Sequence, residues 1–136
     1  MKLIIDANIV IAALIKQALT AKLILDDSLE LIAPAQLKQE VTKYAEYILK
    51  KSKCTQKELD LIQNTLFKAI TLVPYDVFYD SEQQAEAITP DVDDTIYIAL
   101  AIHLKCPLWS NDKALKNQTK VRILSTAELL AIMQNE

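Results

Sequence analysis

Acidic side chains stand beside two apolar segments at positions where they could bind a cation. Asp6 comes directly after the apolar run 3–5, and Asp112 comes two residues after the apolar segment 106–110. If both segments are parallel strands, their carboxyl ends share one edge of the sheet, where ligands of α/β proteins bind. Each residue also has a structural reading, a turn for Asp6 and a helix N-cap for Asp112. Together the two acids indicate a ligand-binding site at this edge of the sheet.

A third carboxylate follows from helix geometry. The helix expected over 35–51 places Glu40 only about 60° from its apolar stripe and Glu46 on the opposite side, facing solvent. The stripe consists of Leu37, Val41, Tyr44 and Ile48. Glu40 is therefore expected at the border between core and water, where its carboxylate can face a cleft.

The segment DVDDTIYIALAIHL (91–104) supplies a fourth candidate. A helix from about Asp93 to Lys105 would be apolar almost all round and hence buried, with Asp93 and Asp94 in its first turn. Acids near a helix N-terminus are favourable by up to about 1 kcal/mol, which is the structural reading. Three aspartates in four residues exceed what a cap requires, and a cation would relieve their repulsion.

The amino-acid composition limits the kinds of catalytic and metal site that the chain can form. One histidine, His103, leaves no partner for a His-based metal site or a Ser-His-Asp triad. Cys54 and Cys106 lack metal-ligand spacing and are expected as reduced thiols, at least one of them buried. With no glycine, the chain lacks both glycine-rich phosphate loops. An all-oxygen site favours Mg²⁺ or Mn²⁺, which can activate water for displacement at a phosphodiester.

Apolar runs and helical patterns alternate along the chain. The strands are short and continuously apolar, which is typical of a parallel sheet covered on both faces. Strands are expected at 2–5, 29–33, 69–74, 106–110 and 121–124. Helices are expected at 8–16, 19–26, 35–51, 55–68, 76–88, 93–105, 112–117 and after Ser125. Thr55 with Glu58, and Ser125 with Glu128, match capping boxes.

Length and charge limit the possible domain organisation, location and partners of the protein. At 136 residues the chain is expected to be one domain, residues 1–136, and 51% hydrophobic composition excludes disorder. No signal peptide is expected, and no apolar run reaches the ~18 residues of a membrane span, so a cytoplasmic protein is expected. A net charge of −3 argues weakly against broad nucleic-acid binding, since bound metal would reverse the local sign. The basic run 50–53 suits a solvated helix end or a contact with phosphate.

Four segments, LIIDANIVIAAL, LIAPAQLKQEV, DVDDTIYIALAI and CPLWSNDKAL, occur in the order found in a known family. In these segments the chain resembles a PIN domain, the fold of many metal-dependent ribonucleases, including toxins of toxin–antitoxin pairs. The resemblance spans nearly the whole chain. It implies a PIN-like α/β fold, a three-layer α/β/α sandwich around a five-stranded parallel sheet.

The resemblance also implies which residues act. The acidic metal site and catalytic centre correspond to Asp6, Glu40, Asp94 and Asp112. Asp94 is preferred to Asp91 and Asp93 because of its spacing to Ala101, although Asp93 could share the role. Asn8 and Ser110 match small polar positions beside the site, with an implied contact to metal-bound water. The implied partners are Mg²⁺ or Mn²⁺, RNA, an antitoxin protein and a second copy in a homodimer.

The chain departs from the family in its arginine content. Many PIN domains carry an arginine in or near the first helices or the active site, whereas the only arginine of this chain, Arg122, lies in a predicted strand. RNA contacts would then come from lysines such as Lys16, Lys38, Lys43 and Lys113. Lysine binds phosphate as a point charge without bidentate geometry, so weak or loosely specific RNA binding is expected.

Two other functions compete with a ribonuclease. DVDDT (91–95) matches the D-x-D-x-T of haloacid-dehalogenase-type phosphotransferases, but that motif must follow a buried strand, and here a predicted helix end and Pro90 precede it. The alternative is a non-catalytic PIN-like binding module acting through protein partners. The apolar segment 8–25 could contribute to such an interface, although core packing also explains it.

Overall fold

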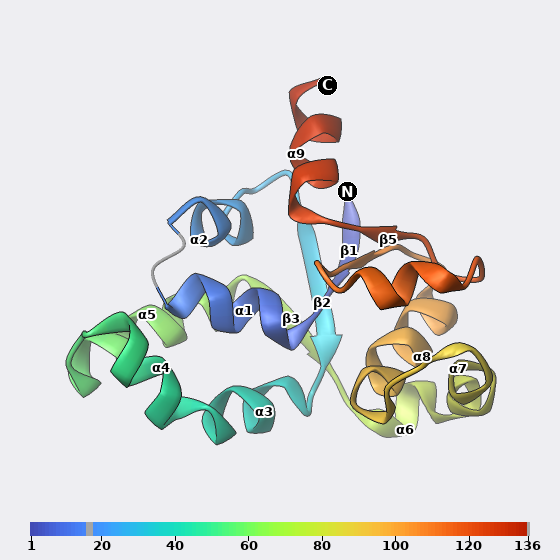
Figure 1. Ribbon diagram of the computed structural model, residues 1–136, viewed down its shortest axis with the longest axis horizontal. Helices are drawn as coiled ribbons and strands as arrows, with labels where there is room; N and C mark the ends of the chain where they lie inside the picture. Colours follow the sequence, from blue (N-terminus) through green and yellow to red (C-terminus); the bar gives the residue numbers. More distant parts are fainter. Residues whose placement is uncertain (16–17, 136) are drawn as a thin grey trace.

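The computed structural model describes residues 1–15 and 18–135, and these residues form a five-stranded parallel sheet (Figure 1). The strand order is β3-β2-β1-β4-β5. The strands are β1 (Lys2–Ile5), β2 (Glu30–Pro34), β3 (Ile70–Val73), β4 (Leu108–Trp109) and β5 (Ile123–Leu124). Each lies within or overlaps one of the five predicted segments, and β3, β4 and β5 are shorter than predicted. The predicted α/β fold with a five-stranded parallel sheet is confirmed.

Strand β1 lies at the centre of the sheet. It pairs with β2 on one side and with β4 on the other, where Ile4 and Ile5 are in register with Leu108 and Trp109. Ile4 and Ile5 have no exposed surface, because helices cover both faces of the sheet. This burial explains why residues 3–5 of β1 are all apolar and why the next polar residue, Asp6, comes directly after the strand.

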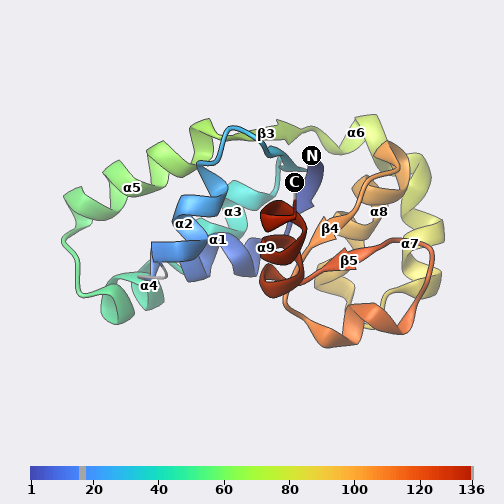
Figure 2. The same ribbon diagram turned by 90° about the horizontal axis from the view of Figure 1, so that it is seen from above.

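Helices form layers on the two sides of the strands (Figure 2). One side carries α1 (Ala7–Leu14), α2 (Ala18–Ile24), α3 (Leu37–Lys43), α4 (Ala45–Ser52) and α5 (Gln56–Lys68). The other carries α6 (Tyr75–Phe78), α7 (Glu82–Ile88) and α8 (Thr95–Leu104), and α8 packs against β1, β2 and β4. Helix α9 (Thr126–Gln134) follows β5. Three short 3₁₀ turns complete the described elements: η1 (Tyr79–Ser81), η2 (Val92–Asp94) and η3 (Lys113–Asn117).

Both predicted capping boxes are present. The Thr55 hydroxyl accepts a 3.1 Å hydrogen bond from the Glu58 amide at the start of α5. The Ser125 hydroxyl accepts one of 3.1 Å from the Glu128 amide at the start of α9. These caps fix the first turns of two helices whose positions the sequence therefore predicted closely.

The prediction of a single helix over 35–51 is wrong, because the helix is interrupted at Tyr44, between α3 and α4. Tyr44 has φ −99° and ψ 13°, outside the α-helical range. One turn earlier, the Thr42 hydroxyl donates to the Lys38 carbonyl at 2.8 Å, a bond that often bends helices. Tyr44 is 45% exposed, so it leaves the predicted apolar stripe. Glu46 is exposed, as predicted.

Three other helix predictions need correction. The helix expected over 76–88 divides into α6, η1 and α7, because Phe78 leaves the helical range at φ −125° and ψ 10°. Helix α8 begins at Thr95, so Asp93 and Asp94 lie in η2 and not in the first turn of the helix. The short helix expected at 112–117 is the 3₁₀ turn η3.

The remaining expectations concern isolated side chains. His103 is exposed at the end of α8. Cys54 and Cys106 are free thiols, and both are only partly buried, so the expectation that at least one would be buried is wrong. Within the described residues, no helix is both long and apolar enough to cross a membrane.

Candidate active site

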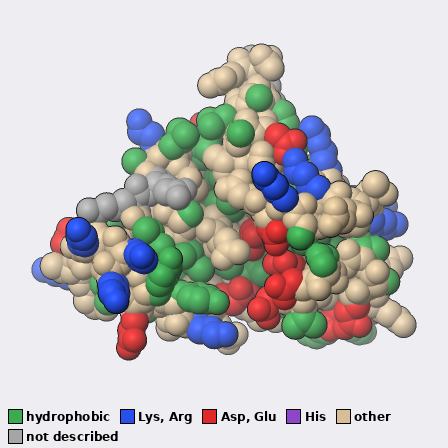
Figure 3. Space-filling model, in the orientation of Figure 1, with side chains coloured by type: hydrophobic (Ala, Val, Ile, Leu, Met, Phe, Trp, Pro, Cys, Tyr) green, Lys and Arg blue, Asp and Glu red, His purple; other side chains and the backbone are tan. Residues whose placement is uncertain are grey.

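Acidic side chains from four separate segments line one cavity of about 220 Å³. The cavity lies where β1 ends, and acidic side chains gather near the centre of the face seen in Figure 3. Its polar lining comprises Asp6, Asn8, Glu40, Tyr44, Asp91, Asp93, Asp94 and Asp112. The four predicted acids, and the auxiliary residues Asn8 and Asp93, are thus brought together.

Asp6 occupies the junction between β1 and α1. Its amide donates to the Trp109 carbonyl at 3.1 Å, which extends the pairing with β4 by one residue. Its extended backbone then places it at the N-cap position of α1. The side chain is 4% exposed, and this burial raises the pKa of the Asp6 carboxyl, while a hydrogen bond from Ser110 acts in the opposite direction. Burial therefore favours the neutral form of Asp6, and a bound cation would favour its ionised form.

Ser110 links two of the acids although it does not itself line the cavity. Its hydroxyl donates to Asp6 Oδ2 at 2.8 Å and accepts from the Asp112 amide at 3.2 Å. The side chain is 1% exposed and follows β4 directly. The predicted auxiliary position is therefore beside the site, and its observed partners are Asp6 and the Asp112 backbone.

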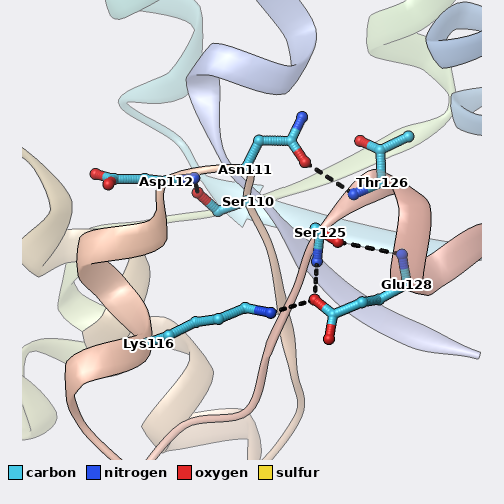
Figure 4. A network of polar contacts seen from close by, with 7 residues as sticks. All are labelled: Ser110, Asn111, Asp112, Lys116, Ser125, Thr126 and Glu128. Carbon is cyan, nitrogen blue, oxygen red and sulfur yellow. Dashed lines mark hydrogen bonds and ion pairs between the residues drawn. The ribbon is translucent and has the colours of Figure 1, made fainter.

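Asp112 caps a short turn, as its structural reading predicted, and it also lines the acidic cavity. Its Oδ1 accepts from the Ala114 amide at 3.0 Å, so it caps η3, and its side chain lines the acidic cavity. Figure 4 shows it beside Ser110, at the end of a polar network that continues through Asn111 to the start of α9. There, Asn111 Oδ1 accepts from the Thr126 amide at 2.8 Å. The loop carrying Asp112 is thereby tied to α9.

Glu40 is held by a residue that the sequence analysis missed. The Tyr97 hydroxyl, on α8, donates to Glu40 Oε1 on α3 at 2.9 Å. Burial raises the pKa of Glu40, the bond from Tyr97 lowers it, and the charge of Asp6 raises it further. Tyr97 is 1% exposed, and burial followed by the charge of Glu40 raises the pKa of its phenol. A tyrosine inside an apolar helix needs a hydroxyl partner, and that signal could have pointed to it.

Asp94 lies in the most crowded electrostatic position. Its side chain is half-buried, and burial, followed by the charges of Asp6 and Asp112, raises its pKa to about 7. Asp91 adds to this effect and lines the cavity, although the sequence analysis set it aside. Asp91 Oδ1 also accepts from the Asp93 amide at 3.0 Å, which caps η2. The cavity therefore concentrates negative charge beyond what capping needs.

The donor set of this cavity fits a hard divalent cation. Its candidate ligands are carboxylate oxygens, and the pKa of Asp94 is raised first by burial and then by the charges of the neighbouring acids. As the side chains stand, no group of three or more His, Cys, Asp or Glu residues in the described part of the chain has metal-holding geometry. Coordination would thus require rotation of some carboxylates into the cavity.

The lysines predicted to contact RNA are dispersed. Lys38 Nζ lies 5.7 Å from the centre of the Phe67 ring, and Lys43 Nζ lies 6.0 Å from that of Tyr44. Lys113 lines a separate cavity that shares Asp112 with the acidic one. Lys16 is outside the described residues. Of these, Lys43 lowers the pKa of Glu40 and so lies within electrostatic reach of the site.

Comparison with known families settles the relationship that this geometry indicates. A family model described as "PIN domain" matches residues 4–130, from β1 into α9. The chain belongs to the PIN domain family. PIN domains are generally nucleases that depend on divalent metal and act on RNA. A search of curated proteins gives no significant match.

The structure also bears on the phosphotransferase alternative. In this PIN domain the DVDDT segment follows α7 and forms η2, whereas the phosphotransferase motif must end a buried strand. The aspartates of this segment instead join Asp6 and Asp112 around the cavity. The segment therefore belongs to the acidic site at the carboxyl edge of the sheet.

Proposed function

We propose that this protein is a single PIN domain, residues 1–136, acting as a Mg²⁺- or Mn²⁺-dependent endoribonuclease. The observation that supports this most strongly is the convergence of Asp6, Glu40, Asp94 and Asp112 on one cavity from four separate segments. The pKa of Asp94 is raised to about 7 by burial and then by the charges of Asp6 and Asp112, and a bound cation would favour its ionised form. Carboxyl groups with raised pKa values at the ligand edge of a parallel sheet are typical of a metal-binding active site.

In the proposed mechanism these four carboxylates hold the metal. When bound, the ion supplies an activated water and stabilises charge on the phosphodiester. Ser110 keeps Asp6 Oδ2 in a fixed direction, and Tyr97 does the same for Glu40 Oε1. Because both supporting hydroxyls are buried, Asp6 and Glu40 would be oriented before substrate arrives, which lowers the reorganisation that their part in catalysis needs.

We further propose a cytoplasmic toxin of a toxin–antitoxin pair that forms a homodimer. The feature that favours a protein partner is that α4 and α5 each carry exposed large apolar side chains, namely Tyr47, Leu61 and Ile62. Exposed apolar surface of this kind suits a partner's apolar helix. A binding module without turnover would use the same surface, so the two functions separate only by activity.

The deciding experiment is cleavage of a mixed labelled RNA by purified protein with Mg²⁺ or Mn²⁺. EDTA and Asp6→Asn should each abolish cleavage, whereas Asp27→Asn, an exposed aspartate outside the cavity, should leave it unchanged. Cleavage that survives both EDTA and Asp6→Asn would exclude the acidic site as its source. Absence of both cleavage and Mn²⁺ binding by calorimetry would favour the binding module.

A further inference from the structure

A second cavity, of about 590 Å³, lies at the opposite end of β4 and β5 from the acids. Its lining includes Cys106 and Pro107, which precede β4, and Val121 and Arg122, which precede β5. By contrast, Ser110 and the acidic cavity follow the end of β4. The two cavities are thus separated along the strand direction, and we call this one the basic cavity.

Three cations face the basic cavity: Lys105, Lys120 and Arg122. All three are exposed, and within the described residues none of them forms an ion pair and no Asp or Glu lines the cavity. Lys105 ends α8, where the helix dipole favours a cation, but that does not account for Lys120 and Arg122. Arg122 is also the chain's only arginine. Glu30 lies outside this lining, although its charge raises the pKa of Cys106. Three cations in one lining that contains no acidic residue indicate an anionic ligand.

The chemistry of the lining indicates which anion. Arg122 can present a planar fork that matches phosphate, and the lysines add point charges around it. The Gln84 amide offers a further donor, and the other lining residues are aliphatic or Cys106. No aromatic side chain among the described residues lines the cavity, so it offers no platform for stacking bases. The cavity is therefore suited to phosphate groups irrespective of the base.

We propose that the basic cavity binds phosphate groups of an RNA backbone, away from the bond that is cleaved. The choice of RNA as the ligand rests on the function proposed above. The preference for phosphate groups rests only on the residues that line the cavity. The acidic cavity repels a polyanion, and the net charge of −3 gives no general attraction. A separate cationic site supplies affinity and positions the strand without disturbing the metal ligands.

Cys106 provides a local reporter, because its partly buried thiol lines the basic cavity. Cys54 is the internal control: it lies between α4 and α5, its sulfur 2.9 Å from the Ser52 hydroxyl, outside this lining. The rate of iodoacetamide labelling of each thiol is followed by peptide mass spectrometry in EDTA, where turnover is blocked. A short RNA oligonucleotide should slow labelling of Cys106 several-fold and leave Cys54 unchanged. Pyrophosphate tests a small phosphate ligand in parallel.

Charge variants test the same site by affinity. Arg122→Gln should weaken RNA binding by about tenfold in fluorescence anisotropy, since it removes a charge-assisted contact. Lys105→Gln with Lys120→Gln should lower the dependence of log K on log salt by about 2. The matched control, Lys22→Gln with Lys57→Gln, makes the same charge change on exposed residues of α2 and α5 and should have little effect.

Specific outcomes would overturn the proposal. If RNA does not protect Cys106, or if the control pair weakens binding as much as the cavity variants, the basic cavity is not an RNA site. Protection by pyrophosphate but not by RNA would overturn the assignment to RNA. Because binding is measured in EDTA, a failure of metal-dependent cleavage leaves these results untouched, so failure of the nuclease and failure of this site are distinguishable.

Discussion

The Tyr97 hydroxyl and Glu40 Oε1 are joined by a 2.9 Å hydrogen bond between α8 and α3, which cover opposite sides of the sheet. This bond lies at the carboxyl edge of the sheet, beside the acidic cavity. Tyr97 is 1% exposed, so its ring cannot turn away without disturbing the core. The orientation of a half-buried carboxylate is therefore fixed by the packing of the central helix.

Tyr97→Phe should weaken the acidic site without unfolding the protein. The ring keeps its packing, but Glu40 loses the donor that orients it, and loss of such a supporting bond typically costs about tenfold or more in metal affinity. We expect Mn²⁺ binding by calorimetry to weaken by about tenfold and cleavage to fall in proportion. Tyr47→Phe, on an exposed tyrosine of α4, is the control and should change neither. Unchanged Mn²⁺ affinity in Tyr97→Phe would remove the positioning role.

Ser110→Ala should affect both stability and the site. The substitution leaves the buried Asp6 Oδ2 without its donor and the Asp112 amide without its acceptor. An unsatisfied buried group costs about 1–3 kcal/mol, so the free energy of unfolding in urea should fall by about that amount in EDTA. The matched control is Ser81→Ala, on a partly buried serine of η1 outside the acidic cavity. Equal losses in the two variants would contradict a special role for Ser110.

The order of elements could be predicted because β1 and α8 each carry a strong local signal. A continuous apolar strand ending on Asp6, and a helix apolar all round, have few alternative placements in an α/β fold. The break at Tyr44 could not be predicted, because the apolar spacing of Leu37, Val41 and Ile48 suits one helix as well as two. That break depends on backbone conformation at one residue, which periodicity does not encode.

Asp6, Glu40 and Asp112 could be placed from sequence, because strand ends and a helix border specify positions relative to the sheet, whereas Asp94 was chosen through the family resemblance. The resemblance also indicated Ser110, but not the contact between Tyr97 and Glu40. Tyr97 and Glu40 are 57 residues apart, and their bond depends on how α3 and α8 approach each other. The basic cavity was missed for the same reason, since Arg122 looks like an isolated strand residue until β5 places it near Lys105.

Divalent metal should stabilise the folded protein. A ligand that binds only the folded state adds about 2.7 kcal/mol when present at a hundred times its dissociation constant. Mn²⁺ should therefore raise the melting temperature of the wild type by several degrees, measured by circular dichroism against EDTA. Asp112→Asn, which keeps an oxygen to cap η3 but removes one charge, should lose most of this increase. Asp27→Asn should retain it, and equal increases in both variants would argue for binding elsewhere.

Without metal, stability should fall as pH rises through neutrality. The pKa of Asp94 is raised from 3.8 in the unfolded chain to about 7 in the folded protein. The folded state thus holds a proton that the unfolded chain releases, so the stabilisation is full below about pH 4 and is lost as pH passes 7. The full shift corresponds to about 4 kcal/mol, which solvent screening of this half-exposed group reduces to about 1–2 kcal/mol. Urea unfolding in EDTA should therefore give a larger free energy near pH 5.5 than near pH 8. Asp94→Asn should reduce this difference and Asp27→Asn should preserve it, whereas a wild type that gains stability over this range would contradict the crowding of charge at Asp94.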